Sequence, residues 1–169
     1  MVNRKPHRRD LLAGLATVPV LPLAARAETV IDLEWDDLLP VGAEPVPQVL
    51  FDMVDHQSAP LSSQQPASSG VRSDWNGQIV RLPGFIVPIE HRGTGVSAFI
   101  LVPYVGACVH VPPPPANQLV FVTTSPPYES KGLFEPVNVT GMFGVSSIST
   151  QIAQVGYALS AEKVEPFDL

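Results

Sequence analysis

The sequence predicts a mainly β protein: a small five-stranded, partly open barrel of the OB type that follows an irregular N-terminal segment. From Gly77 onward, apolar residues alternate with polar ones or gather in short runs, as they do in β-strands, while helical periodicity is weak. Gly84 and Gly141 lie inside two of the longer runs, where a glycine lets one strand bend and serve two sides of a barrel. A β-sandwich is the alternative fold.

The predicted strands all lie after Gly77. They are expected at residues 78–89, 97–104, 118–124, 136–145 and 155–164, with one helical turn near 150–153. Upstream, residues 32–40 predict a short helical turn closed by a proline. Residues 58–70 are rich in Ser, Gln, Pro and Ala, a composition typical of loops.

The first 27 residues resemble an export signal peptide. A basic start precedes an apolar stretch over 11–25, and Ala25-Arg26-Ala27 forms a small-x-small cleavage site. Arg8-Arg9 followed by two leucines resembles a twin-arginine signal, and Sec export is the alternative. We therefore expect a periplasmic protein, soluble after cleavage. Its expected organisation is a signal at 1–27, an irregular segment at 28–76 that packs on the barrel, and the barrel at 77–169.

Charge argues against nucleic acid as a partner. The whole chain carries a formal charge of −6, and the leader holds five of the ten basic residues and one of the sixteen acidic residues. The remainder therefore carries −10, which repels phosphate backbones. No other apolar run reaches membrane length, so the protein is not expected to span a membrane.

Cys108 is the only cysteine, so no intrachain disulfide can form, and His110 follows two residues later. In an extended backbone these two side chains would point to the same face. Thiolate and imidazole are zinc ligands, and Glu90, at the end of the preceding strand, is the preferred third; His91 and His56 are further candidates. Such an open site suits metal exchange, and Cu(I) is the other candidate metal. Alternatively, Cys108 is simply buried and His110 is hydrogen-bonded structure.

A catalytic use of the same pair is also open. A histidine that lowers the thiol pKa would make Cys108 a nucleophile of a Cys–His hydrolase, with Glu90 or Asn117 orienting the imidazole. No donors for an oxyanion are evident in the sequence, and a single cysteine excludes CxxC oxidoreductase chemistry. We therefore expect a binding protein rather than an enzyme.

Four consecutive prolines follow the Cys–His pair and predict a stiff polyproline II arm. Such an arm loses little entropy on binding, so it is a candidate docking surface for a transporter or another periplasmic protein. The alternative is a rigid loop whose prolines pack on aromatic side chains and protect a sheet edge, and whose amide side chains only bond the backbone of that same loop. The candidate partner-binding residues are Tyr104, Pro112, Pro113, Pro114, Pro115, Asn117 and Gln118.

Three segments together resemble the bacterial domain-of-unknown-function family 3299, over about residues 75–169. They are Gly77-x-x-Val80-x-Leu82-x-Gly84-Phe85-x-Val87-Pro88-x-Glu90, the stretch from Leu101 to Gln118 with its Cys-x-His-x-Pro-Pro-Pro-Pro-x-Asn-Gln motif, and Gly156-Tyr157. The resemblance implies exported proteins often encoded beside an ABC-type transporter and a His-rich periplasmic protein, in zinc-responsive clusters. It therefore implies a periplasmic metal-binding accessory protein for zinc delivery or buffering. A metal-free adaptor that uses the proline arm is the alternative.

Overall fold

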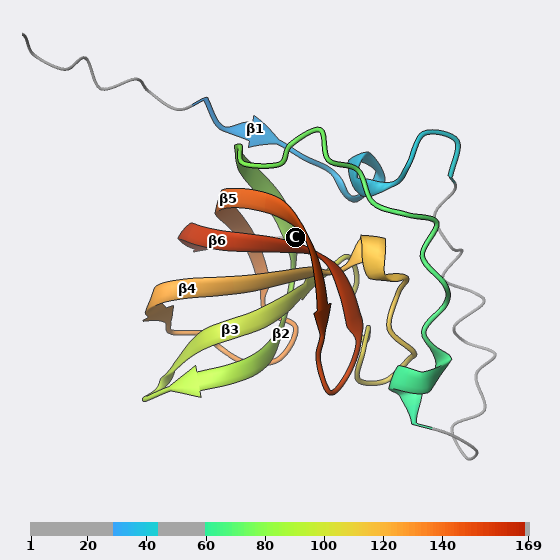
Figure 1. The fold of residues 1–169 in the computed structure, drawn as a ribbon. Coiled ribbons are helices and arrows are strands. Elements are labelled where there is room, and N and C mark those ends of the chain that lie inside the picture. Colours follow the sequence, from blue (N-terminus) through green and yellow to red (C-terminus); the bar gives the residue numbers. More distant parts are fainter. Residues whose placement is uncertain (1–28, 44–59, 168–169) are drawn as a thin grey trace, which may run out of the picture.

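The fold is that of a computed structural model, which describes residues 29–43 and 60–167 (Figure 1). The elements of the N-terminal part are β1 (Ile31–Asp32) and the short 3-10 helices η1 (Trp35–Leu38) and η3 (Leu61–Gln64). The barrel is built from β2 (Ile79–Arg92), β3 (Gly95–Val102), β4 (Val120–Tyr128), β5 (Pro136–Ser149) and β6 (Gln154–Pro166), with η4 (Ala116–Gln118) just before β4. The predicted strands and the early helical turn are therefore present.

The strand pairings confirm a five-stranded barrel of the OB type. β2 pairs with β3, β3 with β4, β5 with β6 and β5 with β2, all antiparallel, whereas β4 and β6 run parallel. The ring is closed rather than partly open, because the N-terminal half of β2 pairs with β5. β1 adds a short parallel strand to β2 from a segment in which no strand was expected.

Two glycines let the long strands change direction, as predicted. β2 pairs with β5 as far as Phe85 and with β3 from Phe85 onward, so Gly84 lies where the strand passes from one neighbour to the other. A Cβ atom on Gly84 would lie 2.8 Å from Leu101 Cγ, and one on Gly141 would overlap the carbonyl oxygen of Ser160. Only glycine allows such close approach of neighbouring strands.

Two apolar clusters lie on opposite faces of β2, β3 and β4. Along β3, Phe99 and Leu101 belong to the barrel interior, while Ile100 and Val102 belong to a second cluster on the outer face. This alternation is the period-2 geometry of a strand. We call the second group the outer cluster; its buried members are Val87, Ile100, Val102, Ala107, Cys108, Leu119, Ala153 and Val155.

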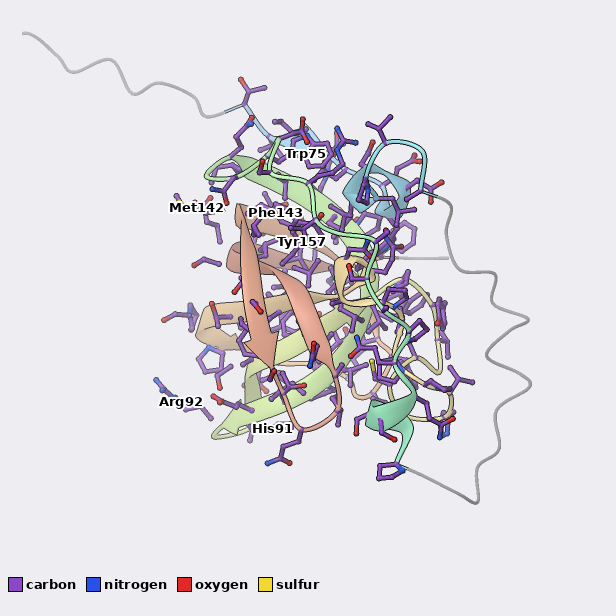
Figure 2. All side chains as sticks on the ribbon, turned by 45° about the vertical axis from the view of Figure 1, so that its right-hand side comes forward. Trp75, His91, Arg92, Met142, Phe143 and Tyr157 are labelled. Carbon is purple, nitrogen blue, oxygen red and sulfur yellow. The ribbon has the colours of Figure 1, made fainter. Side chains whose placement is uncertain are left out.

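The described part of the N-terminal segment runs along the outside of the barrel (Figure 1). The buried Tyr157 hydroxyl donates to the Leu38 carbonyl and accepts from the Arg72 amide, both at 2.7 Å. Figure 2 shows Trp75, Phe143 and Tyr157 gathered at this side of the barrel, with His91 at the other end. Among residues 29–43 and 60–167, no helix is long and apolar enough to cross a membrane.

Candidate functional site

Cys108 lies in a turn and not in a strand. The amides of Val109, His110 and Val111 all donate to the Gly106 carbonyl, at 3.3, 2.9 and 3.2 Å. Cys108 itself has φ 66°, in the left-handed region that non-glycine residues seldom adopt. The extended backbone assumed for this pair is therefore wrong, because the chain reverses between the end of β3 and the prolines. Spacing alone does not place the thiol and the imidazole on one face.

The two side chains of the pair differ in burial. Cys108 is 6% exposed within the outer cluster, and this burial raises the pKa of its thiol to about 12. His110 is exposed, and its ring centroid lies 6.1 Å from that of Phe134. A thiol with so high a pKa is almost wholly protonated near neutral pH, which disfavours a nucleophilic role.

Glu90, the expected third ligand, lies near the end of β2 with its side chain exposed. Within the part of the chain that the structure describes, no three His, Cys, Asp or Glu side chains form a group that could hold a metal ion. His91 is exposed beside Glu90, and His56 lies outside the described residues. Zinc or Cu(I) binding by Cys108, His110 and Glu90 stays a prediction.

The four prolines, Pro112 to Pro115, are buried. Gln65 of the N-terminal segment links Pro114 to the start of β6: its Nε2 donates to the carbonyls of Pro114 and Gln154, and its Oε1 accepts from the Gln154 amide, all at 2.8 Å. The prolines themselves therefore present little surface to a partner.

The amides that follow the prolines also bind the N-terminal segment. Asn117, 1% exposed, donates from Nδ2 to Ser69 Oγ at 2.9 Å and to the Gly70 carbonyl at 2.8 Å. Gln118 donates from Nε2 to the Trp35 carbonyl at 2.9 Å. The two amides therefore bond mainly a distant segment, and not only the backbone of their own loop as the alternative expected.

Tyr104, the remaining candidate of the arm, packs half-buried against the outer cluster. Burial raises the pKa of its hydroxyl well above the ordinary value, and the neighbouring Cys108 thiol raises it further. The side chain therefore stays neutral at physiological pH, and its ring serves to cover the outer face of β3.

Sequence reasoning did not find an open groove on the outer face of the barrel. It comprises two adjoining hollows, of about 510 and 370 Å³, which share Glu90 and Phe121. We call it the outer groove. The first hollow is lined by Pro88, Ile89, Glu90, Phe121 and residues 148–152, and the second by Glu90, Arg92, Ser97, Ala98, Phe121, residues 123–125 and Pro127.

The outer groove is the uncovered end of the outer cluster. Ile89, Phe121, Ile148 and Ile152 pack against that cluster and also line the first hollow. Beside this apolar floor, the exposed Glu90 supplies a carboxylate. Such a groove can hold an apolar group next to a cation. The sequence predicted Glu90 as a metal ligand and not as part of a groove. The sequence feature that could have indicated the groove is Phe121, an aromatic residue at an outward-facing position of β4.

Comparisons with known proteins agree with the fold. The model of DUF3299, described as a protein of unknown function, matches residues 35–166. The crystal structure of a DUF3299 family protein from Pseudomonas aeruginosa PAO1 is similar, with 36% sequence identity and a TM-score of 0.73. The match covers 83% of this chain and 98% of that chain. A comparison with curated proteins gives no match.

Proposed function

This chain belongs to the DUF3299 family, whose function is unknown, and we propose from its geometry that it is a binding module for a short segment of a partner protein. One observation carries the proposal: the apolar outer cluster continues uncovered into the outer groove, where Glu90 stands between the two hollows. A partly exposed apolar surface with a few polar groups is the usual character of a binding site.

The shape of the groove favours an extended peptide. Its hollows follow one another along β2, from Pro88 to Arg92, and along β4, from Phe121 to Pro127. The five residues of β2 from Pro88 to Arg92 span about 13 Å between their first and last Cα atoms, at about 3.3 Å per step. A peptide of four or five extended residues has the same length. The groove therefore fits a short linear segment.

The chemistry of the groove specifies the segment. Ile89 and Phe121 offer an apolar floor, which favours an aliphatic or aromatic side chain by about 25 cal/mol per Å² buried. The exposed Glu90 favours a Lys or Arg beside it, by no more than about 1 kcal/mol because water screens the pair. The exposed Arg92 lines only the second hollow, so the cation is expected at the first. The overall acidity of the chain points the same way, toward a cationic segment and away from nucleic acid.

The proposed setting is the periplasm. The signal-like pattern of residues 1–27 supports export, and the partner is a transporter domain or another exported protein. The partner would contact the outer groove and not the proline arm, since the four prolines are buried and Gln65 bonds the Pro114 carbonyl.

A peptide array tests the proposal. Hexapeptides that place Leu, Ile or Phe next to Lys or Arg should bind with a Kd on the order of 10–100 μM, as expected for a small open site. Glu90→Gln should remove the preference for a cation and keep the preference for an apolar residue, while Phe121→Ser should abolish binding. Glu162→Gln, an exposed acid of β6, is the matched control. If Glu90→Gln and Phe121→Ser both bind the peptides as the parent chain does, the outer groove is not the peptide-binding site.

Zinc delivery or buffering alongside an ABC-type transporter is the second candidate. The observation that favours it is the left-handed backbone of Cys108, because strained non-glycine residues cluster at ligand-binding sites. The turn would have to open to bring the buried thiol to His110 and Glu90. Calorimetric titration with zinc distinguishes the candidates. A metal site at Cys108 requires Cys108→Ser to bind zinc more weakly than the parent chain. Equal stoichiometry and affinity in the parent chain and in Cys108→Ser would show that Cys108 is not a ligand.

A further inference from the structure

Three aromatic residues from separate parts of the chain line one small hollow of about 240 Å³. Trp35 belongs to η1, Phe85 to β2, and Phe167 directly follows β6. Each of the three is only partly buried, and Phe167 is 37% exposed, so the core of the barrel does not use their whole surface. We call this hollow the aromatic pocket. The rest of its wall is formed by Pro83, Gly84 and Pro103.

Hydrogen bonds hold the three aromatic residues in place. Trp35 Nε1 donates to the Pro83 carbonyl at 2.8 Å, which ties η1 to β2. The Phe167 amide donates to the Pro136 carbonyl at 2.9 Å. Phe85 lies where β2 pairs with both β3 and β5. The walls of the aromatic pocket are therefore fixed before a ligand arrives, and a preorganised site loses little entropy on binding.

The side chains of the pocket wall have no hydrogen bond to offer a ligand. The indole nitrogen of Trp35 is the only polar side-chain atom among the lining residues, and it already donates to Pro83. A hydroxyl, a carboxylate or a primary ammonium would lose water there without gaining a side-chain partner, which costs free energy. A nitrogen that carries only carbon groups has no N–H to satisfy, and its methyl groups can contact the rings directly.

The charges around the aromatic pocket favour a cation. Glu34 and Asp36, the chain neighbours of Trp35, are exposed, and no described basic residue forms an ion pair with either. Arg81 lies on the same strand as part of the pocket wall, but its guanidinium pairs with Asp32. The other ion pairs among the described residues are Arg72 with Asp74 and Lys163 with Glu165. Since the whole chain carries −6 as well, a cation is attracted and an anion is repelled.

We propose that the aromatic pocket binds a small free cation through a trimethylammonium group. Aromatic rings attract such a cation through their quadrupole, and tryptophan attracts it most strongly. The chain already holds one cation in this way, because Arg72 Cζ lies 4.5 Å from the centroid of the Trp75 ring. The aromatic pocket shares no lining residue with the outer groove, so this ligand is additional to the peptide proposed above.

The test follows the indole N–H signals of the full chain by NMR during a titration with choline. Trp35 and Trp75 are the two tryptophans of the chain, so one signal reports the aromatic pocket and the other is an internal control whose ring Arg72 already covers. Dimethylbutanol has the shape of choline without its charge, and ethanolamine has the charge without the methyl groups. Phe167→Leu removes one ring from the pocket, and Phe121→Leu makes the matched exchange in the outer groove.

The proposal predicts that choline shifts the Trp35 signal with a Kd on the order of 1 mM and leaves the Trp75 signal in place. Dimethylbutanol and ethanolamine should bind roughly tenfold more weakly, because each lacks half of the cation–ring interaction. Phe167→Leu should weaken choline binding about threefold, the effect of one lost ring, and Phe121→Leu should leave it unchanged.

Four results would overturn the proposal. They are a Trp35 signal that choline does not move, equal binding of choline and either analogue, an equal effect of the two leucine variants, and a response to phosphatidylcholine vesicles without a response to choline. The last result would assign the pocket to a lipid headgroup instead of a free cation.

Discussion

Replacing Tyr157 by Phe removes one buried hydroxyl that joins the barrel to two parts of the N-terminal segment. The hydroxyl donates to the Leu38 carbonyl and accepts from the Arg72 amide, both at 2.7 Å. The phenyl ring can keep its place beside Phe143, whose ring centroid lies 5.0 Å away, so the packing of the core is retained. The substitution therefore isolates the two hydrogen bonds.

The loss of both bonds should lower the free energy of unfolding by about 2–4 kcal/mol. Each bond contributes about 1 kcal/mol net, and each partner left buried without water costs about 1–3 kcal/mol, part of which relaxation recovers. With a urea m-value of about 1.5–2 kcal/mol/M, the midpoint should fall by about 1–2.7 M. Thr124→Val removes an exposed hydroxyl bond to the Pro126 carbonyl and should cost less than about 0.5 kcal/mol.

Urea unfolding followed by tryptophan fluorescence measures the midpoint, and hydrogen exchange of the Arg72 amide reports the bond directly. In Tyr157→Phe, that amide should exchange at least tenfold faster while the β3 amides exchange no faster than global unfolding allows. A midpoint within about 0.3 M of the parent chain, together with unchanged exchange at Arg72, would refute the conclusion that this hydroxyl joins the N-terminal segment to the barrel.

Three further predictions follow from single residues. Gly141→Ala should lower the unfolding free energy by about 2 kcal/mol or more, because its Cβ would overlap backbone, whereas Gly144→Ala meets only a side-chain oxygen and should cost clearly less in the same urea titration. Glu135→Gln should cost about 1–3 kcal/mol, since the buried carboxylate accepts three hydrogen bonds; an unchanged urea midpoint would contradict this. Burial raises the pKa of Cys108 from 9.0 to about 12, so the folded state favours the protonated thiol. The resulting contribution to the stability of the folded state is fully present below pH 9.0 and is lost as the pH rises toward 12. The free energy of unfolding, measured at both ends of that pH range, should fall less in Cys108→Ala than in the parent chain.

The barrel strands could be predicted from the sequence because their signals are local. Alternation identifies each strand, and glycine within a long apolar run marks the bend, as Gly84 and Gly141 show. β1 was not predicted, because a two-residue strand has no periodicity and forms only by pairing with β2. Closure of the ring likewise depends on a pairing between β2 and β5 that no local pattern encodes.

The site could be predicted only in part. The segment around Cys108 has the β-branched residues of a strand, but the hydrogen bonds to Gly106 turn it back on itself. Three of the four hydrogen-bond partners of the Asn117 and Gln118 side chains lie 47 to 83 residues away, so the link that these amides make to the N-terminal segment is invisible in the sequence. The outer groove joins β2, β4 and the β5–β6 connection, so it exists only once the barrel has formed.

The most direct test of the proposed function is an amide NMR titration of the protein with a hexapeptide that carries Phe next to Lys. The proposal predicts that shift changes concentrate on Glu90, Phe121 and residues 148–152, which line the outer groove, and that the Lys dependence disappears in Glu90→Gln. Shift changes centred on residues 104–118 instead, or none at peptide concentrations near the millimolar range, would contradict the assignment of the outer groove as the binding site.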